Sequence, residues 1–261
     1  MIISKFNTTF YNPVEYTANW ENNSLLFNEL IGKEISIEFT GLMICKVCNK
    51  STKKFFGEGF CYPCFNNSPE NSPCILKPEL CEAHLGMGRD TEWEEKHHNQ
   101  SHVVYLAATD VVKVGVTRSS QIPTRWIDQG ASSVIIFAET PNRYEAGKLE
   151  VELKAFYTDK TNYRKMLQNE IDKNIDLIEE KWQTVEQLPS DLQTFISEND
   201  VITELTYPVI TYPKSVQVLN LDKTPLIKGR LNGIKGQYLL FENDLAINIR
   251  RHTGYDIQLI Y

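Results

Sequence analysis

The chain has 261 residues, 41% of them apolar and 23% charged, which is the composition of a globular protein and excludes disordered, collagenous and membrane-spanning chains. No apolar run reaches the roughly 18 residues of a spanning helix and the first residues lack a secretory signal, so we expect a soluble, cytoplasmic protein with no membrane partner. The formal net charge is −7, but the segment 168–200 alone holds nine acidic and two basic side chains, so the total does not exclude a nucleic-acid partner.

The first 44 residues contain one clear strand. The sequence KEISIEFTG, residues 33–41, alternates apolar and polar side chains, as a half-buried strand does. It leads directly into the first cysteine pair. We expect the segment 1–44 to supply strands to a sheet that is completed elsewhere in the chain.

Four cysteines form two Cys-x2-Cys pairs separated by 12 residues: Cys45 with Cys48, and Cys61 with Cys64. This spacing is typical of zinc sites in which each pair supplies half of a tetrahedral shell. The alternatives are disulfides or a thioredoxin-like redox motif, but the chain lacks a secretory signal and a βαβ pattern near the cysteines. We predict a structural zinc ion, because four thiolates leave no position open for water.

A second metal site is predicted between residues 74 and 102. The remaining two cysteines and four of the five histidines fall there. We assign Cys74, Cys81, His98 and His102 to a second zinc ion, because sulfur and imidazole nitrogen are ligands that zinc prefers. The spacing is irregular, and the alternative is that these cysteines are small buried residues while the histidines meet solvent.

The segment 103–167 has the pattern of a compact α/β unit. Thr109 and Asp110 mark a hairpin turn, Pro123 and Gly130 bracket a short helix, and Asn142 is suited to cap a longer one. The predicted elements are strands at 103–107 and 111–117, a helix at 122–129, a strand at 133–139 and a helix from about 143 to 157.

One acidic residue falls on the apolar face of that second helix. At 100° per residue, Glu150 lies within the face made by Ala146, Leu149, Leu153, Phe156 and Tyr157. A buried carboxylate needs a cation, a metal ion or several hydrogen-bond donors. The alternative to a functional role is a structural ion pair with Arg125 or Lys113.

The last third of the chain combines an acidic helical segment with short strands. We expect 168–200 to form surface helices, and we place turns at Asn232-Gly233 and Thr253-Gly254. The predicted strands are 215–222, 225–231, 236–242, 245–250 and 256–261. These strands are expected to pair with the segment 1–44 in a small β-barrel or sandwich.

The central segment resembles the GIY-YIG nuclease superfamily. The resemblance covers about residues 103–165 and is carried by the ββαβα order together with Tyr105, Lys113-Val114-Gly115, Thr117, Arg125 and Glu150. Nearly the whole chain is similar to an uncharacterised bacterial family, domain of unknown function 2797. That similarity is carried by the Cys-x2-Cys ribbon, the KPE-x-C segment, the HxVYLA, KVGxTR, PTRWxDQGA and DKTN blocks, and KGQYL and NIR near the end.

The resemblances imply a chemistry for the central segment. They imply phosphodiester hydrolysis, with Glu150 holding Mg²⁺ or Mn²⁺, Tyr105 as general base and Arg125 on the phosphate. Lys113 replaces the second-strand tyrosine of the superfamily and would lie beside a phosphate or Tyr105. The closer family has cysteines at Asn71, Gly88 and His98, so the second metal site is altered here. The residues expected to contact nucleic acid are Arg118, Arg125, Lys160 and Arg164.

The sequence thus predicts an α+β protein: a GIY-YIG-like small antiparallel sheet with flanking helices, a zinc ribbon, and a barrel or sandwich from the two ends. The leading hypothesis is a zinc-binding protein that binds DNA or RNA and cleaves it; the alternatives are recognition without hydrolysis and a purely structural interaction protein. The predicted segments are 1–44 (β), 45–102 (zinc-binding), 103–167 (GIY-YIG-like), 168–200 (acidic helical) and 201–261 (β, pairing with 1–44).

Overall fold

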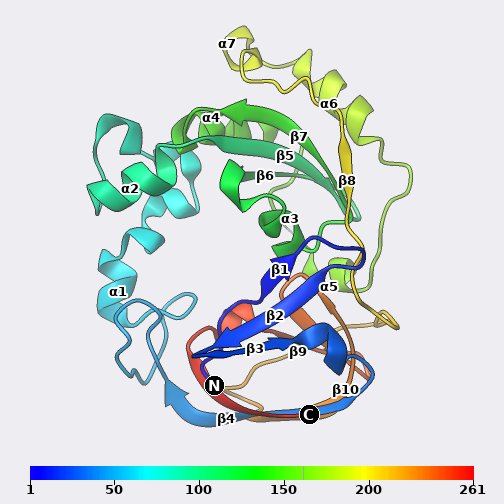
Figure 1. Ribbon diagram of the computed structural model, residues 1–261. Helices are drawn as coiled ribbons and strands as arrows, with labels where there is room; N and C mark the ends of the chain where they lie inside the picture. Colours follow the sequence, from blue (N-terminus) through cyan, green and yellow to red (C-terminus); the bar gives the residue numbers. More distant parts are fainter. Residues whose placement is uncertain (161) are drawn as a thin grey trace.

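The computed structural model describes residues 1–160 and 162–261; Thr161, within the DKTN block, lies outside the described residues. The chain forms three β-sheets with α-helices and short 3-10 helices between them (Figure 1). The fold is therefore of mixed α+β type, as predicted.

The central sheet has four antiparallel strands in the order β6-β5-β7-β8. Its strands are β5 (His102–Ala108), β6 (Val112–Arg118), β7 (Ser133–Thr140) and β8 (Ile202–Glu204). All seven residues of β5 are buried, because the strand has a neighbour on each side and packed layers on both faces. The predicted ββαβα order is confirmed, and β8 extends its sheet from within the segment 201–261.

Helix α4 (Arg143–Leu153) covers one face of this sheet (Figure 1). Its residues Ala146, Leu149 and Leu153 are fully buried in a core that includes strand residues of β5. The Asn142 side chain caps the helix by accepting a hydrogen bond from the N–H of Glu145 at 3.0 Å. The helix ends four residues earlier than predicted, so Phe156 is exposed instead of continuing the apolar face.

Helix α3 (Thr124–Asp128) packs on the opposite face of the sheet. Its Trp126 lies edge-on to Tyr105 of β5, with ring centroids 6.0 Å apart. The helix stops at Gly130, whose φ of 71° is the left-handed conformation that glycine adopts readily. A sheet covered on one face by α4 and on the other by α3 fixes the directions of the polar side chains at its edge.

The two ends of the chain build the other two sheets. The three-stranded sheet consists of β1 (Asn7–Thr9), β2 (Glu15–Trp20) and β3 (Asn23–Leu26). The six-stranded sheet has the order β13-β4-β10-β11-β12-β9, with β4 (Glu34–Met43), β9 (Gln217–Leu219), β10 (Leu226–Lys235), β11 (Tyr238–Phe241), β12 (Leu245–Asn248) and β13 (Tyr255–Ile260). Residues of both sheets share one large core.

The predicted pairing of the two ends is confirmed, because β4 pairs with β10 and β13. A closed barrel is wrong: β13 and β9 are the two edges of the six-stranded sheet, and no ladder among the described residues joins them. The turn predicted at Asn232-Gly233 is also wrong. These residues lie inside β10, at a β-bulge opposite β11, and the chain turns instead at Gly236.

The cysteine-rich segment, residues 45–102, lies alongside both the central sheet and the six-stranded sheet (Figure 1). It contains helices α1 (Tyr62–Asn67) and α2 (Thr91–His98) and the 3-10 helices η2 (Pro69–Asn71), η3 (Pro73–Ile75), η4 (Pro78–Leu80) and η5 (Ala83–Leu85). Proline begins three of these short helices, where its missing N–H has no cost. Apart from α2, the segment therefore consists mostly of single helical turns.

The remaining helices are short. They are η1 (Phe27–Leu30), η6 (Ser119–Gln121), α5 (Tyr163–Leu167), α6 (Leu177–Val185), α7 (Ser190–Gln193) and η7 (Arg250–His252). Leu177 and Leu192 of the acidic segment are buried in the core beneath α4. Among the described residues, no helix has the length and apolar character needed to cross a membrane.

Candidate functional site

A cleft of about 790 Å³ lies where the central sheet, the cysteine-rich segment and the C-terminal sheet meet. Strand β6 and helices α3 and α4 supply one part of its lining, and η3, η4 and α2 supply another. Lys46 and Glu58 of the ribbon and Arg250 and Thr253 of the C-terminal region also line it. Because the lining comes from segments far apart in the chain, the cleft exists only in the folded protein.

The charged side chains of the cleft are mainly basic. Eight lysines and arginines line it against four acidic residues, although the whole chain is acidic. The basic residues are Lys5, Lys46, Arg118, Arg125, Arg143, Lys154, Lys160 and Arg250, and the acidic ones are Glu58, Asp128, Glu150 and Asp159.

Each acidic residue of the cleft is already paired with a cation. Arg250 contacts Glu58 at 2.7 Å and Lys5 contacts Asp128 at 3.0 Å. Lys154 lies 3.3 Å from both Glu150 and Asp159. Lys46 pairs with Glu70, which is not part of the lining. The acidic side chains are therefore neutralised within the protein.

Four cations of the cleft have no carboxylate partner among the described residues: Arg118, Arg125, Arg143 and Lys160. The Arg143 guanidinium donates to the carbonyl oxygens of Cys74 and Ile75, both at 2.9 Å. Burial lowers the pKa of Arg118 and Arg143, but a guanidinium stays charged at neutral pH. A concave surface with this excess of positive charge attracts anions.

Three of the four residues predicted to contact nucleic acid line this cleft: Arg118, Arg125 and Lys160. Arg164 does not; it lies on α5 with its guanidinium 4.9 Å from the Tyr163 ring. The sequence reasoning missed Arg143. Its position on the first turn of the helix that carries Glu150 is the signal that could have identified it.

Tyr105 lies directly behind the cleft. Its side chain is 1% exposed, and its hydroxyl donates a hydrogen bond to Oε1 of the cleft residue Gln129 at 2.6 Å. Burial raises the pKa of Tyr105, and the nearby positive charge of Arg125 offsets only part of the rise. The Glu150 carboxylate is close enough to raise the same pKa further. The fold thus brings Tyr105, Arg125 and Glu150 together, with the phenol neutral.

Glu150 is 8% exposed on the inner face of α4, as the helical periodicity predicted. Burial raises the pKa of its carboxyl, and Lys154 one turn later opposes the rise. The partner predicted for a structural ion pair was Arg125 or Lys113, whereas the observed partner is Lys154, in the i,i+4 arrangement of one helix.

Lys113 does not join the other three predicted residues. It pairs with Ala107 across β5 and β6, two positions along the strand from Gly115, which is opposite Tyr105. Its Nζ is buried without a hydrogen-bond partner among the described residues, and it does not line the cleft. Burial lowers its pKa. The strand geometry therefore directs Lys113 to a different part of the core.

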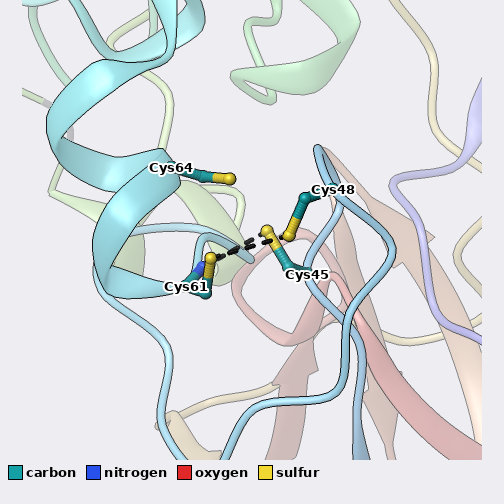
Figure 2. A group of neighbouring side chains, drawn as sticks. All are labelled: Cys45, Cys48, Cys61 and Cys64. Atoms are coloured by element: carbon teal, nitrogen blue, oxygen red, sulfur yellow. Dashed lines mark hydrogen bonds between the residues drawn. The ribbon is translucent and has the colours of Figure 1, made fainter.

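The four ribbon cysteines form one cluster (Figure 2). All four sulfur atoms lie within 4.8 Å of one another, and the Sγ atoms of Cys48 and Cys61 are 3.7 Å apart. Zinc–sulfur bonds of about 2.3 Å at tetrahedral angles place sulfur atoms roughly 3.8 Å apart. The arrangement therefore matches a metal site with four cysteine ligands.

Backbone N–H groups favour the thiolate form within this cluster. The N–H of Cys61 donates to Sγ of Cys45 at 3.3 Å. Burial raises the pKa of the Cys45 thiol, but the N–H groups of Cys48, Cys61 and Val47 outweigh it and bring the pKa to about 6. Thiolate is the form that binds zinc, so these N–H groups favour the metal-binding form at Cys45.

The second cluster differs from its prediction in one ligand. Cys74, Cys81 and His98 come together, but the fourth group is Glu94, and the four ligand atoms lie within 4.8 Å of one another. Glu94 precedes His98 by one turn of α2, so both side chains share a face. Sequence reasoning missed Glu94, although its i,i+4 spacing from His98 was a usable signal.

The assignment of His102 to this cluster is wrong, because α2 ends at His98 and His102 begins β5. Its Nδ1 contacts the carbonyl oxygen of Gln100 at 2.7 Å. Burial lowers the pKa of His102 to about 4.

Glu150 lies outside both of these ligand clusters. Among the described residues, the two cysteine-containing groups are those that bring three or more potential metal ligands together. An Mg²⁺ or Mn²⁺ ion at Glu150 would therefore compete with Lys154, which pairs with both Glu150 and Asp159. Mg²⁺ can be held by one or two carboxylates together with water and phosphate oxygens, so these residues could hold the ion only after Lys154 is displaced, and we derive no catalytic step through it.

A family model described as "Protein of unknown function (DUF2797)" matches residues 32–257, so the chain belongs to that family. The match spans the ribbon, the second cluster, the central sheet and most of the C-terminal sheet, and therefore nearly all of the cleft. Searches of curated proteins and of solved structures gave no match.

Proposed function

We propose that this member of the DUF2797 family is a zinc-binding protein that binds nucleic acid in the basic cleft. The observation that carries the proposal is the pairing pattern of the cleft. Every acidic side chain there has a cation partner, which leaves Arg118, Arg125, Arg143 and Lys160 without a carboxylate partner in the part of the chain that the structure describes. A chain with net charge −7 that gathers such cations in one cleft is suited to a polyanionic ligand.

Zinc has a structural role in this proposal. Lys46 and Glu58, which line the cleft, come from the ribbon that the four cysteines hold together. A closed shell of four thiolates offers no site for a substrate or a water molecule. Zinc would therefore support one part of the cleft and take no direct part in chemistry.

Cleavage of the bound phosphodiester is a second candidate function. It is favoured by the gathering of Tyr105, Arg125 and Glu150, the residues that the GIY-YIG resemblance marks as catalytic. Arg125 would bind the phosphate through its guanidinium fork. The raised pKa of Tyr105, the position of Lys113 outside the cleft and the pairing of Glu150 with Lys154 all favour recognition over hydrolysis.

The proposal is tested by fluorescence anisotropy with labelled single- and double-stranded DNA and RNA, without divalent ions. We expect Arg125→Gln to weaken binding roughly tenfold, because it removes one charged phosphate contact. The matched control is Arg164→Gln, which changes charge equally outside the cleft. Equal affinities for wild type and Arg125→Gln would contradict binding in the cleft.

Cleavage is scored separately on the same substrates with Mg²⁺ or Mn²⁺. The second candidate predicts cleavage that Glu150→Gln abolishes while binding persists. Glu145→Gln is the control, because Glu145 lies on the same helix and also pairs with a lysine, Lys148, at 3.2 Å. Binding without cleavage by the wild type would leave recognition as the function. If the wild type neither binds nor cleaves any of the substrates, a purely structural role would be favoured.

A further inference from the structure

The cluster of Cys74, Cys81, Glu94 and His98 is buried as a unit. The four residues are 5%, 2%, 3% and 3% exposed, respectively. Sγ of Cys74 lies 3.7 Å from Nδ1 of His98, and the same nitrogen lies 2.8 Å from Oε2 of Glu94. Two thiols, an imidazole and a carboxylate thus point at one small volume inside the protein.

The apolar packing around these residues is too small to hold the segment by itself. The local core consists of Cys74, Cys81 and Ala83, with Tyr144 packed against it. The chain around it consists largely of single 3-10 turns. Small protein segments that lack a core are commonly held by a bound metal, whose binding energy becomes folding energy.

The surroundings of Glu94 fix its carboxylate in place. The Ser72 hydroxyl donates to Oε1 at 3.0 Å, and the N–H of Arg89 donates to the same oxygen at 3.3 Å. Oε2 is directed at His98. Hydrogen bonds that hold one carboxylate oxygen while the other faces the ligand cluster are the usual support around a metal ligand.

The charge balance also favours a cation. Two thiolates and a carboxylate carry three negative charges, and a divalent ion leaves one uncompensated. The guanidinium of Arg143 donates to the carbonyl oxygen of Cys74 at 2.9 Å, so one positive charge lies beside the cluster. In the metal-bound state, a divalent ion together with Arg143 would balance these three negative charges.

We infer that Cys74, Cys81, Glu94 and His98 bind a second zinc-class divalent ion. The ion has a closed shell of two sulfur, one nitrogen and one oxygen ligand and a structural role. The ion links η3 and η4 to α2. It thereby fixes the position of the cleft residues Ile75 and Pro78, and of the two carbonyl oxygens that accept hydrogen bonds from Arg143. This effect on the cleft rests on the proposed function, whereas the metal site does not.

X-ray absorption at the zinc edge tests the site in the full-length wild-type protein, purified without chelator and assayed for metal. The inference predicts two zinc ions per chain with an average shell of three sulfur and one nitrogen or oxygen ligand. The ribbon site alone would give one zinc ion with four sulfur ligands. One zinc ion per chain with sulfur ligands only would overturn the inference. Because the wild type is measured, this result does not depend on the folding of any variant.

Variants locate the second ion. The double variant Cys74→Ser, Cys81→Ser should contain one zinc ion per chain instead of two. In Glu94→Gln, a chelator should remove the ion of this cluster before it removes the ion of the ribbon. His102→Asn is the matched control and should keep both ions, since His102 lies outside the cluster. Unchanged zinc content in the double cysteine variant would refute the assignment.

The effect on the cleft is measured by the anisotropy assay with the same variants. Loss of the second ion should weaken nucleic-acid binding to the extent that Arg143→Gln does. Two zinc ions in a protein that binds no nucleic acid would support the metal site and overturn its role in the cleft. This outcome separates failure of the proposed function from failure of the metal site.

Discussion

The Tyr105 hydroxyl donates a hydrogen bond to Oε1 of Gln129 at 2.6 Å, which holds a buried phenol in its neutral form at the back of the basic cleft. Replacing it by Phe leaves the ring in place and removes only the donor. We expect Tyr105→Phe to lower the free energy of unfolding by about 1 kcal/mol, because Gln129 loses its partner. Urea denaturation measures this, and an unchanged free energy would show that the bond contributes nothing.

Gly147 lies on α4 where the helix meets η4. A Cβ atom at this position would clash with the backbone N atom of Glu79 and the carbonyl carbon of Pro78. Gly147→Ala should therefore cost about 1–3 kcal/mol of stability, even though Ala favours a helix. The control is Gly229→Ala, where the nearest atom is 3.7 Å away. Equal thermal stability of the two variants would contradict the close approach.

Lys235 is a buried lysine whose pKa is lowered to about 8 by burial and by the charge of Lys113. The unfolded chain keeps the ordinary pKa of about 10.4, so between these values it binds more protons than the folded protein. Stability should therefore rise as the pH increases from about 8 to 10.4. Chemical denaturation across this range should show the rise in wild type and a smaller one in Lys235→Met. A slope that the substitution leaves unchanged would assign the rise to other groups.

Removal of zinc should open the ribbon before the rest of the molecule. The sheets have their own apolar cores, whereas the ribbon is held by its four cysteines. The side chains of Lys46, Lys50, Lys53 and Lys54 are already exposed, but trypsin needs the backbone around them to unfold. We expect a chelator, or Cys61→Ser, to make the peptide bonds after these lysines susceptible to trypsin, with protection restored to the wild type by added zinc. Mass spectrometry of the fragments identifies the cut sites. Identical digests with and without chelator would argue against a structural zinc ion.

The elements that sequence reasoning predicted well are those with strong local signals. The order of strands and helices from β5 to α4 follows from apolar runs bounded by Pro123, Gly130 and Asn142. The four ribbon cysteines were identified by spacing alone. The strands β1, β2 and β3 were all missed. Strands β1 and β3 are short and largely exposed, so their stability comes from pairing with β2 and not from a pattern of their own.

The parts of the site that sequence could not predict depend on tertiary contacts. His102 is not a ligand because α2 ends at His98 and His102 lies on β5, and no local signal placed the end of the helix. Lys113 lies apart from the other residues predicted to be catalytic, because the strand register places Gly115, and not Lys113, opposite Tyr105. Glu150 pairs with Lys154 and not with Arg125, so among the described residues Arg125 has no carboxylate partner and its positive charge remains available in the cleft.

The salt dependence of nucleic-acid binding tests the central claim most directly. On duplex DNA, each phosphate contact contributes about 0.9 to the slope of log K against log salt concentration. The account predicts that Arg118→Gln, Arg125→Gln and Lys160→Gln together reduce the slope by about 2 to 3, while Arg164→Gln leaves it near the wild-type value. A slope unchanged by the three cleft substitutions, or absent in the wild type, would contradict it.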